Sequence, residues 1–422
     1  MKELNNKKKS IKICSKFYIN NNVTTDKQSI SDGFNSFFVN IGPTLASKIP
    51  NDHRSPTFYM KDRNVQSMLI VPVFEDEVKS IIKNLKINSP GWDSISAVVL
   101  KSTHDNVIRP LTYILNLSMT KGVFPNEMKL AKVIPLFKSG DMMSFSNYRP
   151  VSVLPLFSKI FERIMYTRLL SFINKHKVLY SFQFGFRANH SPDLALIYLV
   201  DKISRALEEG EYVLGLFLDF SKAFDTVNHE ILFTKLESYG VRGVALTWFR
   251  SYLTSRTQYV EYNGSSSSYK NITCGVPQGS ILGPLLFLLY INDLAGVSKK
   301  FFSIFFADDS NLFLSGKTPD ALINEMNEEI VHVTEWLRAN KLSLNLKKTH
   351  FIIFRRPRTK VKLDSELIID GVKINSVCNT KFLGVMIDQR LNFFDHIQYI
   401  KGKVSRGVGF YISAESTLNK QH

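Results

Sequence analysis

The strongest constraint on the fold is an uninterrupted apolar run, Val213–Leu218, that ends at Asp219. A short apolar run of this kind is typical of a strand that is buried on both faces of a sheet. After a turn, a helical pattern extends from about Asn228, a suitable N-cap, to Tyr239. The sequence therefore predicts a buried strand that delivers Asp219 to the edge of a sheet, just before a turn and a helix.

A second acidic position lies between two further apolar runs. Phe301–Phe306 and Asn311–Leu314 flank a short segment that carries Asp308 and Asp309. Two apolar runs joined in this way are typical of a β-hairpin. We therefore expect a hairpin with acidic side chains at its tip, followed by a helix over residues 319–339.

Each acidic position has an ordinary structural explanation when it is considered alone. Asp219 fits a capping role before a helix, and Asp308 and Asp309 suit a hairpin tip. Together they favour a different interpretation, because adjacent carboxylates flanked by phenylalanines repel each other and need a cation to be buried. If the two elements pair, three hard oxygen ligands meet at one sheet edge. Such ligands suit Mg²⁺, and two ions about 3.5–4 Å apart promote in-line phosphoryl transfer.

The charge balance indicates a polyanionic partner. The chain has 54 Lys and Arg against 37 Asp and Glu, a formal net charge of +17. A folded protein this basic is a candidate for binding nucleic acid or an anionic membrane surface, although many basic proteins are merely soluble. Three scattered cysteines form neither a disulfide framework nor a zinc pattern, and the most apolar stretch, residues 281–291, is too short to span a bilayer. We therefore expect an intracellular protein, in the nucleus or the cytoplasm, without a membrane partner.

The length predicts more than one folding unit. A chain of 422 residues exceeds what one hydrophobic core usually organises, so we expect two or three coupled subdomains. The first seventy residues are polar and basic apart from a short amphipathic stretch, which predicts a linker or a loosely packed extension. Farther on we expect a set of regular elements: helices over residues 78–85, 107–119 and 156–176, and a strand over residues 131–137.

A series of short motifs in a fixed order carries a resemblance to a known family. The motifs are GWD at 91–93, VIPLFK at 133–138, NYRPVS at 147–152, FGFR at 184–187, FLDFSKAFDTVNH at 217–229, GVPQGSILGP at 275–284, YIND at 290–293, FADD at 306–309, LSLN at 342–345 with Lys348 and Thr349, and FLG at 382–384. Their order over residues 75–396 resembles the polymerase portion of non-LTR (LINE-type) retrotransposon reverse transcriptases, closest to the jockey and CR1 groups.

The resemblance implies an α+β fold of the right-hand polymerase type. Such a fold has fingers, a palm whose antiparallel sheet is backed by helices, and a thumb, which is truncated in this chain. The implied division of the chain is a basic N-terminal extension or linker at 1–72, an N-terminal finger extension at 73–117, a reverse transcriptase domain at 118–387 with fingers at 118–210 and palm at 211–387, and the start of a thumb at 388–422.

The resemblance also implies roles in catalysis and primer binding. Asp219, Asp308 and Asp309 would hold two Mg²⁺ ions, which Mn²⁺ could replace. The backbone carbonyl of Phe220 would assist them as a ligand. Lys348 would act as general acid for the departing pyrophosphate. Leu383 and Gly384 would help to grip the primer strand.

The nucleotide contacts follow from the same resemblance. Lys138 and Arg149 would hold the incoming triphosphate, and Gln278 and Gly279 would lie beside the sugar and the templating base. Phe224 is where the family places an aromatic ring under the sugar of the incoming nucleotide. Such a ring clashes with a 2′-hydroxyl and so selects deoxynucleotides. Without the surrounding motif, Phe224 would be interpreted as a core residue at the start of a helix.

The implied activity is RNA-directed DNA polymerisation, in which deoxynucleoside triphosphates extend a DNA primer along an RNA template. No endonuclease motif of the family is found, few residues follow Phe382, and Pro192 stands where the family more often has Thr. These departures predict a copy truncated at both ends or a partial gene model. They leave open a second hypothesis, a catalytically silent remnant that only binds RNA.

Overall fold

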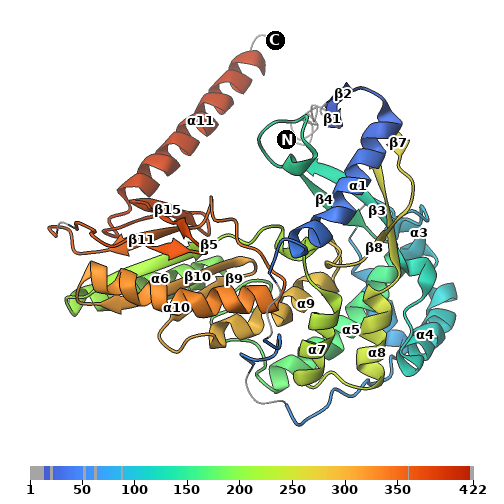
Figure 1. Ribbon diagram of the computed structural model, residues 1–422. Coiled ribbons are helices and arrows are strands. Elements are labelled where there is room, and N and C mark those ends of the chain that lie inside the picture. The colour runs from blue at the N-terminus through green and yellow to red at the C-terminus, as the bar shows by residue number, and fades with distance from the viewer. Residues whose placement is uncertain are drawn as a thin grey trace. The chain divides into compact units, whose positions relative to one another are not determined.

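The computed structural model of the protein describes residues 14–19, 22–50, 54–60, 64–86, 89–359 and 361–418, with side chains up to residue 408. The chain divides into two compact units, each with its own sheet (Figure 1). The first unit comprises Met1–Leu179, Lys222–Asp293 and Arg338–Leu342, and the second comprises Tyr180–Ser221, Leu294–Leu337 and Ser343–His422. The two units are therefore interleaved along the chain.

The second unit contains a five-stranded sheet in the order β14-β11-β5-β10-β9. Its strands are β5 (Tyr212–Leu218), β9 (Phe302–Phe306), β10 (Asp309–Gly316), β11 (His350–Phe354) and β14 (Asn375–Ser376). β5 pairs antiparallel with both β10 and β11, and only the short β11–β14 pairing is parallel. The expected antiparallel pairing of the apolar run with the acidic hairpin is therefore confirmed.

β5 is buried on both faces. Val213 and Phe217 belong to a hydrophobic cluster with Leu199 of α6 (Pro192–Glu208), and Figure 1 draws this helix beside the sheet. Leu216, which alternates to the opposite face, is also fully buried. A strand with apolar side chains on both faces is stable only between two layers, which explains the uninterrupted apolar run.

Further elements complete the second unit. They are α10 (Pro319–Ala339), the short strands β12 (Ile368–Ile369) and β13 (Val372–Lys373), the hairpin of β15 (Asn379–Phe382) and β16 (Val385–Asp388), and α11 (Phe394–Leu418). The predicted helix over residues 319–339 is confirmed as α10. Among the described residues, no helix has both the length and the apolar character needed to cross a bilayer.

The first unit is built on a second sheet, in the order β4-β3-β6-β7, with β8 also pairing to β6. Its strands are β3 (Leu130–Phe137), β4 (Tyr148–Val153), β6 (Arg256–Tyr262), β7 (Ser265–Ser266) and β8 (Lys270–Ile272). β3 and β4 form an antiparallel hairpin, whereas β3 and β6 are parallel. The hairpin is local in sequence and was predictable, but the parallel partner was not.

The rest of the first unit is mainly helical. Its elements are the short strands β1 (Phe17–Ile19) and β2 (Asn22–Thr24) and the helices α1 (Lys27–Ala46), α2 (Glu75–Lys83), α3 (Ala97–Ser102), α4 (His104–Lys121), α5 (Leu156–Lys175), α7 (His229–Ser238), α8 (Val244–Leu253) and α9 (Leu282–Ile291). The predicted cap of α7 is confirmed, since the side chain of Asn228 accepts a hydrogen bond from the Ile231 amide at 3.1 Å.

The N-terminal region is more tightly packed than its composition predicts. Phe34 on α1 is fully buried, and its ring centroid lies 4.9 Å from those of Phe17 and Tyr148. The expectation of a loosely packed extension is therefore wrong for residues 27–46, because a few aromatic side chains carry the contact while polar residues dominate the composition. Residues 1–13 of that extension lie outside the described part of the chain.

Candidate active site

The acidic residues meet at one edge of the sheet in the second unit. Leu218 at the end of β5 is paired with Ser310 of β10, and the same antiparallel register places Asp219 opposite Asp309. Asp309 pairs with Phe306 in the hairpin, so Ala307 and Asp308 form a two-residue turn. The register alone thus brings the three carboxylates predicted from the sequence to one place.

These carboxylates influence one another electrostatically. Burial, followed by the negative charges of Asp308 and Asp219, raises the pKa of Asp309 to about 6. Repulsion of this kind requires the three groups to be close together. Among the described residues, however, no group of three His, Cys, Asp or Glu side chains is arranged to hold a metal ion. The donor set has the hard oxygens and the mutual repulsion that suit a divalent cation.

The segment that follows α10 supports Asp219 from its other side. The Asn345 amide donates to the Asp219 carbonyl at 2.7 Å, and the Asp219 amide donates to Thr349 Oγ1 at 3.4 Å. Lys348 Nζ lies 4.0 Å from Asp219 Oδ2, and both side chains are partly exposed. Phe220 is buried, and the residues directly before and after it form backbone hydrogen bonds with this segment. The predicted residue Lys348 is therefore beside the acidic group, as an exposed ion pair of modest strength.

One residue that supports the acidic turn was not predicted. Gln183 is almost fully buried, and its Oε1 accepts hydrogen bonds from the amides of Ala307 at 3.0 Å and Gly185 at 2.9 Å. A Cβ added to Gly185 would lie 2.2 Å from the Ala307 nitrogen, so only glycine allows this approach. Gly185 belongs to the FGFR motif, but nothing in the sequence distinguishes the preceding glutamine.

The two residues predicted to grip the primer strand occupy a tight turn. Leu383 and Gly384 connect β15 and β16, with φ values of 47° and 96°. A two-residue turn with positive φ at both positions matches the twist of the flanking strands, and glycine adopts it without strain.

The basic residues predicted to hold a triphosphate lie on one hairpin of the first unit. Arg149 on β4 is opposite Leu136 on β3, and both side chains are exposed. Lys138 follows β3 two positions after Leu136, and its amide donates to the Asn147 carbonyl at 2.9 Å. Because alternate residues of a strand share a face, the two cations extend from the same side of the hairpin.

Phe224 lies on a short 3₁₀ turn, Ala223–Asp225, between β5 and α7. Its half-buried ring stacks on Phe287 of α9, with centroids 4.5 Å apart and an angle of 27° between the rings. The Phe224 carbonyl accepts a hydrogen bond from the Val276 amide at 2.8 Å. The sequence predicted the turn, and the structure adds that it is attached to the loop before α9.

That loop contains Gln278 and Gly279. The Ser152 amide of β4 donates to the Gln278 carbonyl at 2.7 Å. Gly279 has φ of 118°, and a Cβ there would lie 2.5 Å from the Ser152 carbonyl oxygen, so no other residue fits. Gln278 Nε2 donates to Asp225 Oδ1 at 2.7 Å. The first unit thus joins the Phe224 turn, the Gln278 loop and the strand that carries Arg149.

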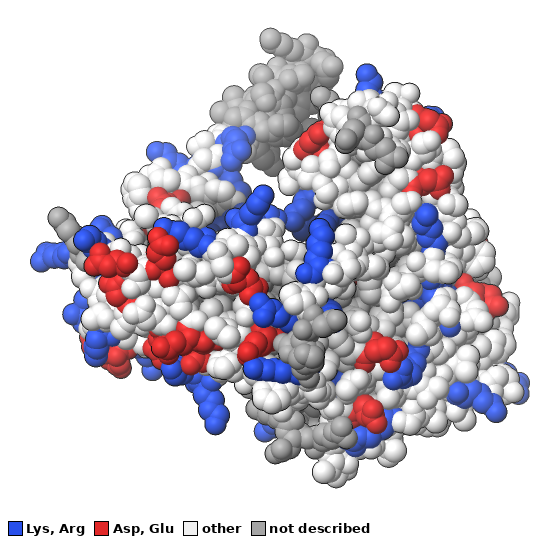
Figure 2. All heavy atoms as spheres, in the orientation of Figure 1, with Lys and Arg blue, Asp and Glu red and all other residues white. Residues whose placement is uncertain are grey.

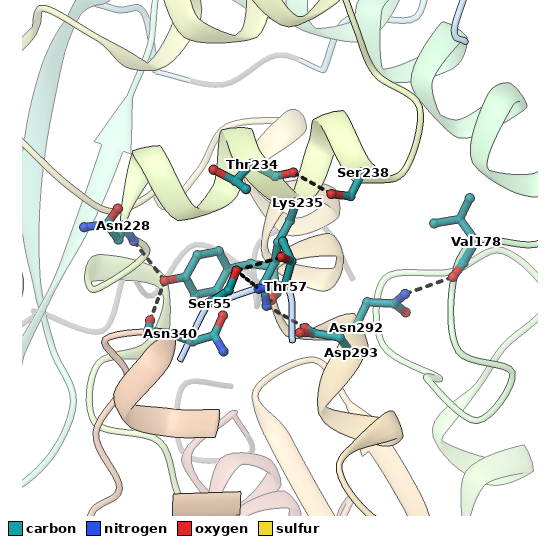
Figure 3. Close-up of polar contacts among 11 residues, drawn as sticks. Ser55, Thr57, Val178, Asn228, Thr234, Lys235, Ser238, Asn292, Asp293 and Asn340 are labelled. Atoms are coloured by element: carbon teal, nitrogen blue, oxygen red, sulfur yellow. Dashed lines mark hydrogen bonds and ion pairs between the residues drawn. The ribbon is translucent and has the colours of Figure 1, made fainter. Parts of the chain in front are cut away.

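A buried polar network fixes the helix that follows the Phe224 turn. Lys235 on α7 is fully buried and forms an ion pair with Asp293 at 2.5 Å, and its Nζ donates to the Tyr290 carbonyl at 2.6 Å. The Tyr290 hydroxyl accepts from the Asn228 amide and donates to the Asn340 carbonyl (Figure 3). Burial lowers the pKa of Lys235, and the attraction of Asp293 opposes this. The network gives a structural reason for the YIND motif, which the sequence resemblance had grouped with the nucleotide-pocket motif.

The positive charge is spread widely over the face that Figure 2 draws. On the face drawn in Figure 2, Lys and Arg side chains occur on both units, with Asp and Glu side chains among them. The net charge of +17 is therefore the sum of many sites. Charge alone would not have located the candidate site.

Comparison with known proteins supplies independent evidence. The reverse transcriptase (RNA-dependent DNA polymerase) family matches residues 138–387. A probable RNA-directed DNA polymerase from transposon X-element of Drosophila melanogaster is 30% identical over 361 residues, which cover 83% of this chain and 39% of the relative.

Two further relatives have similar coverage. The RNA-directed DNA polymerase from mobile element jockey of the same organism is 30% identical, over 82% of this chain and 39% of its own length. A Pol polyprotein from type-1 retrotransposable element R1 of Bradysia coprophila is 27% identical, over 79% of this chain and 33% of its own length. The chain spans about two fifths of the length of the first relatives. Because the family match covers more than half of the chain and includes every acidic residue of the site, the protein belongs to the reverse transcriptase (RNA-dependent DNA polymerase) family.

Proposed function

We propose that the protein is an RNA-directed DNA polymerase that adds deoxynucleotides to the 3′-hydroxyl of a DNA primer along an RNA template. The observation that carries the proposal is the register of β5 and β10, which places Asp219 opposite Asp309 beside the turn that bears Asp308. Burial, followed by repulsion from Asp308 and Asp219, raises the pKa of Asp309 to about 6. Such repulsion suits a site whose function is to bind cations.

The acidic group would hold two Mg²⁺ ions, or Mn²⁺, with the Phe220 carbonyl as a further ligand. When bound, ions of this kind activate the attacking hydroxyl and stabilise the leaving oxygen of an in-line displacement. Lys348, 4.0 Å from Asp219, would donate a proton to the departing pyrophosphate.

The remaining residues bind and orient the substrates. Lys138 and Arg149 bind the triphosphate from one face of their hairpin, where a guanidinium fork and a point charge complement each other. Gln278 and Gly279 lie beside the nucleotide sugar and the templating base, and the Phe224 ring excludes a 2′-hydroxyl. The turn of Leu383–Gly384 grips the primer strand.

The proposed fold assignment follows the family. The sheet of the second unit corresponds to the palm and the β3–β4 hairpin of the first unit to the fingers, with the domain limits at 72, 117, 210 and 387 predicted from the sequence. Residues 388–422 would belong to the thumb. The protein acts in the nucleus or the cytoplasm.

A second candidate function is RNA binding without catalysis. It would rest on the net charge of +17, which supports binding to a phosphate backbone in either case. The two candidates differ in whether nucleotide addition occurs.

Primer extension distinguishes them. The purified chain is incubated with poly(rA)/oligo(dT), dTTP and Mg²⁺ or Mn²⁺, beside Asp309→Asn and the matched control Asp105→Asn, whose carboxylate is exposed and paired with Lys79. We expect extension by the wild type and the control, and a loss on the order of 10³-fold in Asp309→Asn, because one charge-stabilising group is removed. Hybrid binding without extension by the wild type would contradict the proposal and support the RNA-binding remnant.

A further inference from the structure

The turn that carries Phe224 and the loop that carries Gln278 are attached to each other at several points in the first unit. The Val276 amide donates to the Phe224 carbonyl, and the Gly275 amide donates to the Val227 carbonyl, both at 2.8 Å. A Cβ on Gly275 would lie 2.9 Å from the Asp225 carbonyl oxygen, so the two backbones are in close contact. A side chain on the turn can therefore act directly on the loop.

Asp225 provides the side-chain link. Its Oδ1 accepts a hydrogen bond from Gln278 Nε2 at 2.7 Å. Its Oδ2 is buried and has no hydrogen-bond partner among the described residues. A carboxyl group placed in this way is unusual, because an unsatisfied buried anionic oxygen costs stability. An arrangement with that cost points to a role other than stabilising the fold.

The chemistry of the two side chains determines how the Gln278 amide is oriented. An ionised carboxylate accepts hydrogen bonds and has none to donate, whereas a glutamine amide has a donor end and an acceptor end. Gln278 must therefore direct its NH₂ group to Asp225. Its Oε1 then has to be directed away from Asp225. A neutral amide in place of Asp225 would accept or donate equally well, and both orientations of Gln278 would become available.

We propose that Asp225 is a positioning residue that fixes the orientation of the Gln278 amide, and through it the contact with the incoming nucleotide beside Phe224. This inference rests on the proposed polymerase function. Asp225 is not a catalytic residue, because its carboxyl group is buried against the Gln278 loop. Its effect on the substrate passes through Gln278.

The surroundings of Asp225 allow its charge to be varied with pH. Burial raises the pKa of Asp225 to about 6, while the Gln278 hydrogen bond and the charge of Lys222 oppose the shift. Cys274 donates to the Asp225 carbonyl at 3.5 Å, and Arg256 borders the same cavity of about 40 Å³. From α1 this cavity is lined by apolar side chains, and His229 of α7 bonds to the neighbouring Gly275 carbonyl at 2.8 Å.

The first test measures nucleotide kinetics in the primer-extension assay. In Asp225→Asn the KM for dTTP should rise about tenfold, with a smaller change in kcat, because one charge-assisted hydrogen bond is lost. Asp105→Asn, which changes an exposed carboxylate in the same way, should behave as the wild type. When Gln278 is already replaced by Ala, the additional substitution Asp225→Asn should change the KM for dTTP by less than about twofold. The effects of two residues that act through one contact do not add.

The second test needs no catalysis. The side-chain amide of Gln278 is observed by NMR in protein labelled with ¹⁵N at glutamine amides, and its signal is assigned by its loss in Gln278→Leu. In the wild type the signal should move with a midpoint near pH 6, and in Asp225→Asn it should not titrate. If Asp225→Asn does not fold, the wild-type titration alone decides whether Asp225 controls the amide.

The outcomes separate this inference from the proposed function. A wild-type chain that does not extend a primer contradicts the polymerase proposal, and the NMR titration still decides whether Asp225 orients Gln278. A wild-type chain that extends normally, with unchanged kinetics in Asp225→Asn or a Gln278 signal that ignores pH, overturns only the positioning role. Equal and additive effects of the Asp225 and Gln278 substitutions would overturn it as well.

Discussion

Phe224 has one face of its ring covered by Phe287, and this contact determines how the residue can act. An aromatic ring stacked on a buried ring at 4.5 Å is held in one orientation. The Phe224 carbonyl is tied to Val276 as well, so neither the ring nor its backbone is free to withdraw. For the proposed exclusion of a 2′-hydroxyl, a fixed ring would be a better steric filter than a mobile one, because an oversized substrate could not displace it.

Substitution of Phe224 tests sugar selection. Phe224→Val should admit ribonucleotides while deoxynucleotide addition stays measurable, because the smaller side chain leaves room for a 2′-hydroxyl. The ratio of kcat/KM for dTTP and UTP should fall by about 10- to 200-fold, the usual range for exclusion of one small group. Phe58→Val, at an exposed phenylalanine, is the matched control. An unchanged ratio would mean that Phe224 only packs against α9.

At the scale of elements, the acidic turn depends on a segment distant in sequence. Ala307 has φ of 58°, a left-handed conformation that costs a non-glycine residue about 1–3 kcal/mol. The Gln183 side chain accepts a hydrogen bond from the backbone amide of Ala307, and the Phe184 amide donates to the Phe305 carbonyl of β9 at 2.7 Å. The FGFR segment therefore maintains the turn in the conformation that presents Asp308 and Asp309.

Replacing Gln183 should separate positioning of the turn from catalysis itself. Gln183→Ala leaves two buried amides without an acceptor, so the turn should relax and the Mg²⁺ concentration for half-maximal extension should rise several-fold. The KM for dTTP should change little. Gln183→Glu keeps the accepting oxygen and should restore the Mg²⁺ dependence, which a general loss of stability would not explain. Gln66→Ala, at an exposed glutamine, is the control. A normal Mg²⁺ titration in Gln183→Ala would exclude the role.

The elements also indicate what sequence can predict. β5, α5 and α7 were predictable because their apolar periods and caps are local, and the register of β5 with β10 follows from the need to bury both runs. The contacts of Gln183 and Asp225 were not predictable, since a polar side chain can bond to any of many groups that only the fold brings near. The packing of α1 was missed for a related reason, because Phe34 meets partners more than a hundred residues away.

At the scale of the whole molecule, charge should dominate the affinity for nucleic acid. A protein with +17 net charge that contacts a phosphate backbone releases counterions, so its affinity depends steeply on salt. Binding of an RNA–DNA hybrid, followed by fluorescence anisotropy, should weaken by about 10²-fold or more between 50 and 200 mM salt. A nearly flat salt dependence would mean that phosphate contacts contribute little. The Asp309→Asn variant should keep the same salt slope, since it changes catalysis and not the backbone contacts.

The parallel pairing of β3 with β6 has a consequence for biosynthesis. β3 acquires β4 as a partner within a few residues, but its other neighbour, β6, begins only at Arg256, more than a hundred residues later. At a translation rate of about 5–20 residues per second, that edge of β3 stays unpaired for roughly ten seconds. The strand β3 carries Ala131 and Val133, whose side chains are fully buried in the finished protein. An open apolar edge attracts other strands, so the nascent chain is most exposed to wrong strand pairing at this stage, and slower synthesis would prolong that exposure.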